Sequence, residues 1–281
     1  MGRARIVGQG LLRQACLLKV GGNLPRDSVA APVRAGERAA GRPPRSGPPR
    51  PGDRLPPPGG GGTDLPLPLI GEVIASNNDA YPVGSTLFGM TGWQEYAVMG
   101  AGSNPIPDGI DPTAALSVFG VTGLTAYFGL LDVGRPKAGE TLVVSGAAGA
   151  VGSIAGQIGK IVGCRVVGIA GSDAKCAWLT DELGFDAAIN YKTEGFCERT
   201  LAHTGGEGVD IIIDIVGAPY LDRNISLLKL RGRLVFLALL GGAQAQVNIG
   251  TLMGRRLRLI GSVLRSRSLA EIPFASPTGR P

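Results

Sequence analysis

The stretch TLVVSGAAGAVGSIAGQIGKIV, residues 141–162, decides the fold of this chain. Its first four residues are typical of a buried strand, and a glycine-rich turn at residues 145–152 follows at once. In such a turn Gly149 would let the backbone approach a pyrophosphate, and Gly152 would let the next helix pack closely on the strand. That helix, which runs to about Val162, offers free N–H groups and a positive dipole to the anion. The stretch therefore predicts the phosphate-binding turn of a dinucleotide site, with an ordinary glycine-rich turn as the alternative.

From Gly139 onward, apolar strands alternate with amphipathic stretches such as residues 173–183 and 195–203. Strands that are apolar on both faces and alternate with helices indicate a parallel sheet that is covered on both sides. We therefore expect an α/β fold, a doubly wound parallel sheet of the Rossmann type, over residues 116–268. The expected strands are residues 141–144, 165–169, 187–190, 210–215, 233–238 and 258–262.

The end of the second expected strand indicates which dinucleotide is bound. A site specific for NAD usually places Asp or Glu there, where the carboxylate accepts hydrogen bonds from the ribose 2′-hydroxyl. Here residues 169–172 read IAGS, and Lys175 follows. A small, uncharged floor with a nearby cation would tolerate a 2′-phosphate and pair with it, so we predict NADPH as the cofactor. Asp173 complicates this prediction, since it could be the N-cap or a first-turn acid of the next helix, and Lys175 could be an ordinary exposed residue.

Residues 63–115 predict the remnant of a β-rich domain. Short strand candidates at residues 69–75, 86–88 and 93–99 are separated by Gly, Pro and Asn. The pair Asp111-Pro112 predicts a helix start, with Asp111 as the N-cap and Pro112 in the first helical position. Two short helices are then expected up to Leu130, leading into the Rossmann domain.

The basic charge of the chain is confined to its first part. Residues 1–62 hold eleven Lys and Arg against three acids, together with ten Pro and thirteen Gly. Such a composition cannot bury enough apolar surface to offset its ordering entropy, so we expect disorder there and in the tail at 269–281. Residues 63–281 hold seventeen basic and nineteen acidic residues, although the whole chain carries a formal charge of +6. The high isoelectric point therefore does not predict a nucleic-acid partner for the folded part.

Cysteine and histidine usage argues against disulfides and metals. Cys16, Cys164, Cys176 and Cys197 form no C-x-x-C pair, and His203 is the single histidine. We expect reduced thiols, no zinc site and a cytoplasmic protein. No run reaches the roughly eighteen apolar residues of a membrane span. Residues 1–22 contain Arg and Lys but no acid, which leaves open a mitochondrial transit peptide or a wrongly joined N-terminus.

Residues 89–98 (GMTGWQEYAV), residues 123–130 (GLTAYFGL) and the glycine turn resemble the zinc-independent medium-chain dehydrogenase/reductase superfamily. Over residues 69–205 the chain is most similar to the prostaglandin and leukotriene reductase group, which reduces enones and alkenals with NADPH. From about residue 210 it is more similar to the quinone oxidoreductase branch. The resemblance implies a partial GroES-like catalytic domain before the Rossmann domain, a homodimer, and hydride transfer to a quinone or an α,β-unsaturated carbonyl substrate.

The chain departs from this family at both ends, because nothing in residues 1–62 resembles the family's first strands and residues 269–281 replace its final helix and strands. The alternative function is therefore an inactive NADPH-binding module or a truncated gene product. By resemblance, Lys175 and Tyr191 contact the adenosine 2′-phosphate, and residues 216–217, 237–240 and 262–264 lie along the nicotinamide half. The complete expected cofactor site is Ala148, Gly149, Ala150, Val151, Gly152, Gly171, Ser172, Lys175, Tyr191, Val216, Gly217, Leu237, Ala238, Leu239, Leu240, Val263 and Leu264.

No firm catalytic residue emerges from the sequence. Tyr127, with Thr122 and Thr125 close by, is the weak candidate for a donor to the acceptor oxygen, which gains negative charge during reduction. The alternative for Tyr127 is a buried aromatic that packs between the domains. We interpret His203 as a partner of a helix C-terminus and the three cysteines after residue 160 as unreactive packing residues.

Overall fold

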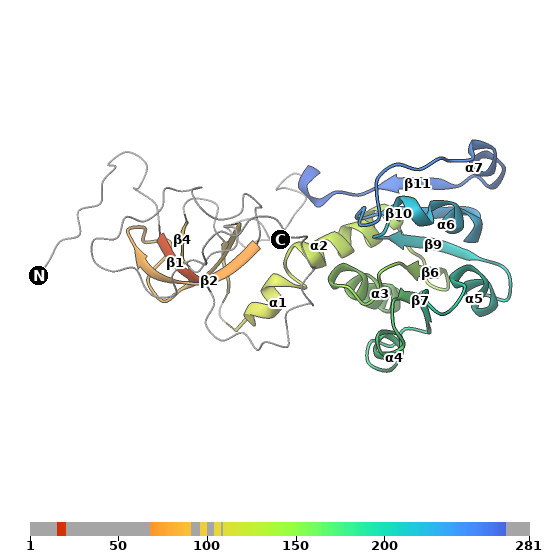
Figure 1. Ribbon diagram of the computed structural model, residues 1–281. Coiled ribbons are helices and arrows are strands. Elements are labelled where there is room, and N and C mark those ends of the chain that lie inside the picture. The colour runs from red at the N-terminus through yellow and green to blue at the C-terminus, as the bar shows by residue number, and fades with distance from the viewer. Residues whose placement is uncertain (1–15, 21–67, 91–95, 100–103, 108, 268–281) are drawn as a thin grey trace, which may run out of the picture. The chain divides into compact units, whose positions relative to one another are not determined.

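The computed structural model describes residues 16–20, 68–90, 96–99, 104–107 and 109–267 (Figure 1). The chain divides into two compact units, the first ending at Leu116 and the second beginning at Ser117. The expected tail at residues 269–281, and most of the segment interpreted as a transit peptide, lie outside the described residues.

The first unit contains a five-stranded sheet in the order β4-β1-β2-β3-β5, and its described pairings are antiparallel. Val73, Leu87, Ala97 and Met99 form its buried core. This sheet agrees with the prediction of a β-rich region, although residues 93–95 of the third candidate strand, 93–99, are outside the described residues. The elements are β1 (Cys16–Val20), β2 (Pro68–Ser76), β3 (Thr86–Met90), β4 (Tyr96–Met99), β5 (Asn104–Pro105) and α1 (Pro112–Leu116).

The expectation of disorder throughout residues 1–62 is wrong at β1. This strand pairs with β2 on one side, where Leu17 lies opposite Ala75, and with β4 on the other. Its sequence, CLLKV, contains no Pro or Gly. Two neighbouring strands satisfy the backbone groups of these five residues, which a composition averaged over 62 positions could not reveal.

Asp111 caps α1, as predicted. Its Oδ1 accepts hydrogen bonds from the Thr113 hydroxyl, from Thr113 N at 2.7 Å and from Ala114 N at 3.2 Å. The bond from the Thr113 hydroxyl, followed by those from the two backbone N–H groups, holds the pKa of this carboxyl below its usual value. The cap therefore favours the ionised carboxylate.

The second unit contains a six-stranded sheet in the order β11-β10-β9-β6-β7-β8, and its pairings are parallel. This is the strand order of a Rossmann fold, in which β7 and β8 are added on one side of β6 and β9, β10 and β11 on the other. The predicted doubly wound sheet is confirmed. Its strands are β6 (Thr141–Val144), β7 (Arg165–Ala170), β8 (Ala187–Asn190), β9 (Val209–Asp214), β10 (Leu228–Phe236) and β11 (Arg258–Gly261).

Helices cover both faces of this sheet (Figure 1). Side chains alternate between the faces along each strand, so that Leu142 and Ile213 belong to one buried core and Val143 and Ile212 to the other. The first core packs against α2 (Val121–Tyr127), the π-helix η2 (Phe128–Gly134), α3 (Ala150–Val162) and α4 (Asp173–Asp181). The second packs against α5 (Phe196–His203), α6 (Leu221–Leu227) and α7 (Ile249–Arg255). Two short 3-10 helices, η3 (Ala218–Tyr220) and η4 (Leu264–Ser266), follow β9 and β11.

Asp186 connects α3 to β7 and is expected to make stability depend on acid pH. Its carboxylate accepts hydrogen bonds from Lys160 Nζ at 2.7 and 2.8 Å and from Val166 N at 2.7 Å. Partial burial alone would raise the pKa of this carboxyl, but the bonds from Lys160 and Val166 outweigh it and hold the pKa below its usual value. The stabilisation is therefore present above the unfolded pKa of about 4 and is lost as pH falls through the lower folded pKa.

We expect Asp186→Asn to lower the free energy of unfolding by less than about 1 kcal/mol at pH 7, since the carboxylate is partly exposed. The difference from wild type should shrink below about pH 4. Urea unfolding between pH 7 and pH 3 measures this, with the exposed Glu182→Gln on the end of α4 as the control. A difference that persists unchanged at pH 3 would show that the carboxylate charge is not responsible.

Candidate functional site

The turn between β6 and α3 leaves an open helix N-terminus. Gly146 adopts a φ of 57°, which favours glycine, and its carbonyl accepts a hydrogen bond from Gly149 N at 2.9 Å. Gly149 precedes α3 with extended backbone and no side-chain cap. Among the described residues, no acceptor lies on the first N–H groups of the helix, those of Ala150, Val151 and Gly152. These donors and the helix dipole suit an anion at Gly149.

Gly152 allows α3 to approach the turn closely. A Cβ atom at this position would lie 2.5 Å from Gly146 O and 2.8 Å from Ala147 Cα. Ala147 is buried, and its N–H donates to Ile169 O at 3.0 Å, which fixes the turn to the end of β7. Ala148 and Val151 pack against the first core of the sheet. The start of the helix is therefore held in place by backbone contacts.

At the end of β7 the structure decides between the two interpretations of Asp173. Ser172 is the N-cap of α4, since its hydroxyl accepts a hydrogen bond from Lys175 N at 3.4 Å. Asp173 is the first residue of the helix, and its Oδ1 accepts a hydrogen bond from Asn190 Nδ2 at 2.7 Å. Asp173 is thus a first-turn acid that is already bonded to a side chain of β8.

Tyr191 lies beside Gly171, at the end of β7. A Cβ atom built on Gly171 would lie 3.4 Å from the Tyr191 hydroxyl oxygen and 3.5 Å from Lys192 Cε. Tyr191, Lys175 and Lys192 are all exposed. Asn190 and Lys192 flank Tyr191 in the stretch that belongs to the family resemblance, but sequence reasoning gave neither of them a role. The signal that could have found them is the run of polar residues that begins where β8 ends.

A buried carboxylate organises the loop that follows β9. The side chain of Asp214 is fully buried and accepts four hydrogen bonds. The donors are Ser145 Oγ at 2.7 Å, Val216 N at 2.8 Å, Gly217 N at 3.1 Å and Asn224 Nδ2 at 3.3 Å. Sequence reasoning did not assign Asp214 a role, although an acid at the end of the apolar run 211–213 was a signal.

The segments expected along the nicotinamide half lie at the carboxyl ends of β9, β10 and β11. Leu237 N donates to Asp214 O at 2.8 Å, Leu240 N to Ile215 O at 3.3 Å and Gly241 N to Val216 O at 2.8 Å. Residues 215–217 and 237–241 therefore run side by side. Leu237 and Ala238 are half-buried, whereas Leu239, Leu240 and Val263 are exposed and Leu264 is half-buried in η4.

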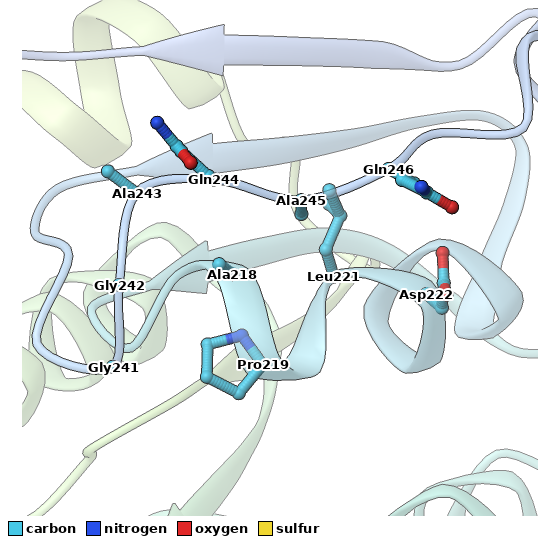
Figure 2. Close-up of a pocket in the computed structure, with 10 residues that line it drawn as sticks. All are labelled: Ala218, Pro219, Leu221, Asp222, Gly241, Gly242, Ala243, Gln244, Ala245 and Gln246. Atoms are coloured by element: carbon cyan, nitrogen blue, oxygen red, sulfur yellow. The ribbon is translucent and has the colours of Figure 1, made fainter.

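An open groove of about 770 Å³ continues from these segments (Figure 2). Ala218 and Pro219 of η3 and Leu221 and Asp222 of α6 form one side, and the extended residues 241–246 form the other. The Ala218 N–H donates to Gly242 O at 3.1 Å and joins the two sides at one end. The groove thus adjoins the segments assigned to the nicotinamide half and not the glycine turn.

Tyr127 is 49% exposed in the described structure, and the alternative of a buried aromatic between the domains stays a prediction. Its ring meets Phe128 edge-on, with 5.3 Å between centroids. Tyr127, Phe128, Leu131, Asp132 and Arg267 line a second open groove, of about 400 Å³. The hydroxyls of Thr122 and Thr125 donate to Ser117 O and Val121 O, so they serve the helix backbone. The phenol of Tyr127 is the hydroxyl of this group that remains exposed.

The surroundings of Cys164, Cys176, Cys197 and His203 indicate structural roles for these residues. Burial raises the pKa of the thiols of Cys164, Cys176 and Cys197, which disfavours the reactive thiolate. His203 ends α5, where a basic side chain complements the helix dipole. Within the described ranges, no group of three or more His, Cys, Asp or Glu side chains could hold a metal ion. In the same residues, no helix is long and apolar enough to span a membrane.

Comparisons with known proteins agree with this architecture. The family profile described as zinc-binding dehydrogenase matches residues 150–275. The putative NADP-dependent oxidoreductase YfmJ of Bacillus subtilis is 44% identical over 205 residues, which are 72% of this chain and 59% of YfmJ. Prostaglandin reductase 1 of Bos taurus is 44% identical over 170 residues, covering 59% of this chain and 51% of that enzyme.

A solved structure shows the same arrangement. CurA from Vibrio vulnificus in complex with NADPH superposes with a TM-score of 0.67 and 36% sequence identity, covering 74% of this chain and 65% of CurA. The present chain spans between half and two thirds of the length of these relatives. The glycine turn, the parallel sheet and these matches together support the assignment of the chain to the zinc-independent medium-chain dehydrogenase/reductase superfamily.

Proposed function

We propose that this protein binds NADPH and transfers its hydride to a quinone or an α,β-unsaturated carbonyl compound. The observation that carries the proposal is the open N-terminus of α3 behind Gly149, together with an uncharged floor at Gly171 and exposed lysines nearby. The free N–H groups of α3 fit a pyrophosphate, and the exposed lysines near Gly171 fit a 2′-phosphate. The names of the relatives, NADP-dependent oxidoreductase and prostaglandin reductase, support the same assignment.

In this proposal the backbone holds most of the cofactor. Ala148, Gly149, Ala150, Val151 and Gly152 would hold the pyrophosphate, and Gly171, Ser172, Lys175 and Tyr191 would hold the adenosine 2′-phosphate. The nicotinamide half would lie along Val216, Gly217, Leu237, Ala238, Leu239, Leu240, Val263 and Leu264. The exposed leucines among them would exclude water from the reacting carbon, which favours hydride transfer.

When bound, NADPH would supply the hydride, so the protein needs only to orient the acceptor and stabilise its oxygen. That oxygen gains negative charge and requires a hydrogen-bond donor or a proton from water. The exposed phenol of Tyr127 is the candidate donor in the second unit. If it has this role, Tyr127→Phe should lower kcat with little change in the Kd for NADPH.

The second candidate function is an NADPH-binding module without catalysis. The matched part of the chain covers 59% of YfmJ and 51% of prostaglandin reductase 1. The two candidates predict the same cofactor binding. They differ in whether an acceptor consumes the cofactor.

Fluorescence titration of the full chain with NADPH and NADH tests the shared part. We expect tighter binding of NADPH, and oxidation when a simple quinone or enone is added in the same cuvette. Binding without oxidation would support the module, and failure to bind either cofactor would refute both. A homodimer belongs to the same proposal, and sedimentation of the purified protein tests it.

A further inference from the structure

We propose that Lys192, held in place by the buried side chain of Asn190, is a second cation for the 2′-phosphate of NADPH. This inference rests on the proposed function and adds a residue that determines cofactor preference. The family resemblance pointed to Lys175 and Tyr191, whereas the geometry at Gly171 adds Lys192.

The position of Lys192 follows from its distance to the floor of the site. Lys192 Cε lies 3.5 Å from the place where Gly171 would carry a Cβ atom, and the Tyr191 hydroxyl oxygen lies 3.4 Å from it. Gly171 directly follows β7, and the end of this strand is where a Rossmann fold meets the 2′ position of the ribose. The ammonium group of Lys192 is therefore within reach of a phosphate at that position, beside the phenol.

Asn190 explains why the site formed by Gly171, Tyr191 and Lys192 suits a phosphate although the Asp173 carboxylate lies next to it. Asn190 is only 5% exposed, and its Nδ2 donates to Asp173 Oδ1 at 2.7 Å. Its Oδ1 accepts a hydrogen bond from Lys192 N at 3.2 Å. One amide thus fixes the backbone of Lys192 and at the same time anchors the carboxylate that would repel the phosphate.

The side chains of Lys175 and Lys192 are available to bind a ligand. Lys160 and Lys229 form ion pairs with acids, whereas neither Lys175 nor Lys192 does so among the described residues. Tyr191 is braced edge-on by Tyr220, with 6.4 Å between ring centroids. The site therefore combines the positive charges of Lys175 and Lys192 with the hydroxyl of Tyr191, whose ring is held in place by Tyr220.

Binding of two nucleotides by calorimetry tests the proposal on the full chain. The 2′,5′-ADP probe carries the 2′-phosphate and 5′-AMP lacks it. A charge-assisted hydrogen bond is worth about 1.5–3 kcal/mol, so Lys192→Gln should weaken 2′,5′-ADP binding about ten- to hundredfold. Binding of 5′-AMP should stay within about twofold of wild type, because that probe has no phosphate at the position in question.

Lys137→Gln is the matched control, because Lys137 is an exposed lysine before the amino end of β6, whereas Gly171 follows the carboxyl end of the parallel neighbour β7. If wild type preferred 2′,5′-ADP over 5′-AMP and Lys192→Gln kept the same preference, this inference would be overturned and the proposed function would stand. If wild type bound neither probe, both would fail.

The positioning role of Asn190 has its own readout. Asn190→Ala should release Asp173 and reduce the preference for 2′,5′-ADP over 5′-AMP. Adding Asp173→Asn should restore part of that preference, because the released negative charge is removed. An equal loss of affinity for both probes, without rescue by Asp173→Asn, would show that Asn190 only supports the fold.

Discussion

Gly152→Ala is expected to abolish NADPH binding and to lower the free energy of unfolding by about 1–3 kcal/mol, the usual cost of overpacking. The added methyl group would lie 2.5 Å from Gly146 O and 2.8 Å from Ala147 Cα. Both contacts are with backbone that cannot rotate aside, so α3 must move away from the turn. The N–H groups that would hold the pyrophosphate move with it.

NADPH titration and urea unfolding of the same preparation measure the two effects. Gly254→Ala is the matched control, since Gly254 also lies in a helix, α7, and a Cβ atom there would meet nothing within 4 Å. The control should keep its affinity and gain up to about 1 kcal/mol in stability, because alanine favours helix over glycine. Normal NADPH affinity in Gly152→Ala would contradict the assignment of the turn.

Asp214→Ala should produce the largest loss of stability, on the order of 3–5 kcal/mol, because each buried donor left without a partner costs about 1–3 kcal/mol. All four donors belong to buried or half-buried groups, namely Ser145 Oγ, Val216 N, Gly217 N and Asn224 Nδ2. The same bonds shape the loop at residues 215–217. Cofactor affinity should therefore fall as well.

A loss of stability of that size could prevent Asp214→Ala from folding, so two milder variants test the same prediction. Ser145→Ala removes only the hydroxyl that bonds Asp214 and Ile215 N, and it should cost about 1–2 kcal/mol. Asp214→Asn retains one acceptor oxygen and should fall between the two. Urea unfolding ranks the three variants by their free energy of unfolding. If Asp214→Ala lost less stability than Ser145→Ala, the proposed role of the carboxylate would be refuted.

Strand positions in the second unit were predictable because apolar runs between glycines and polar turns are local signals. β6 and β8 have the predicted bounds of residues 141–144 and 187–190. β10 was predicted at residues 233–238 but spans Leu228–Phe236. Its start was hidden by a register shift between Leu228 and Arg233, where polar residues interrupt the apolar run. Its last residue is Phe236, two residues before the predicted end.

The parts of the candidate site that escaped prediction depend on partners far apart in sequence. Asn190 bonds to Asp173, 17 residues earlier in the chain, and Asp214 bonds to Ser145, 69 residues earlier. Neither pair produces periodicity, spacing or a composition change. The glycine turn was predictable because all of its function lies within eight consecutive residues, 145–152.

The place of β1 in the first sheet has a practical consequence for producing shorter forms of the protein. β1 lies between β2 and β4, and in the described sheet β4 pairs with no other strand. Composition alone would suggest starting expression at residue 63, where the Pro- and Gly-rich segment ends. That product would lack β1, leaving β4 without a partner and one edge of β2 unpaired. Unpaired strand edges associate with one another, so such a shortened protein would be prone to aggregate.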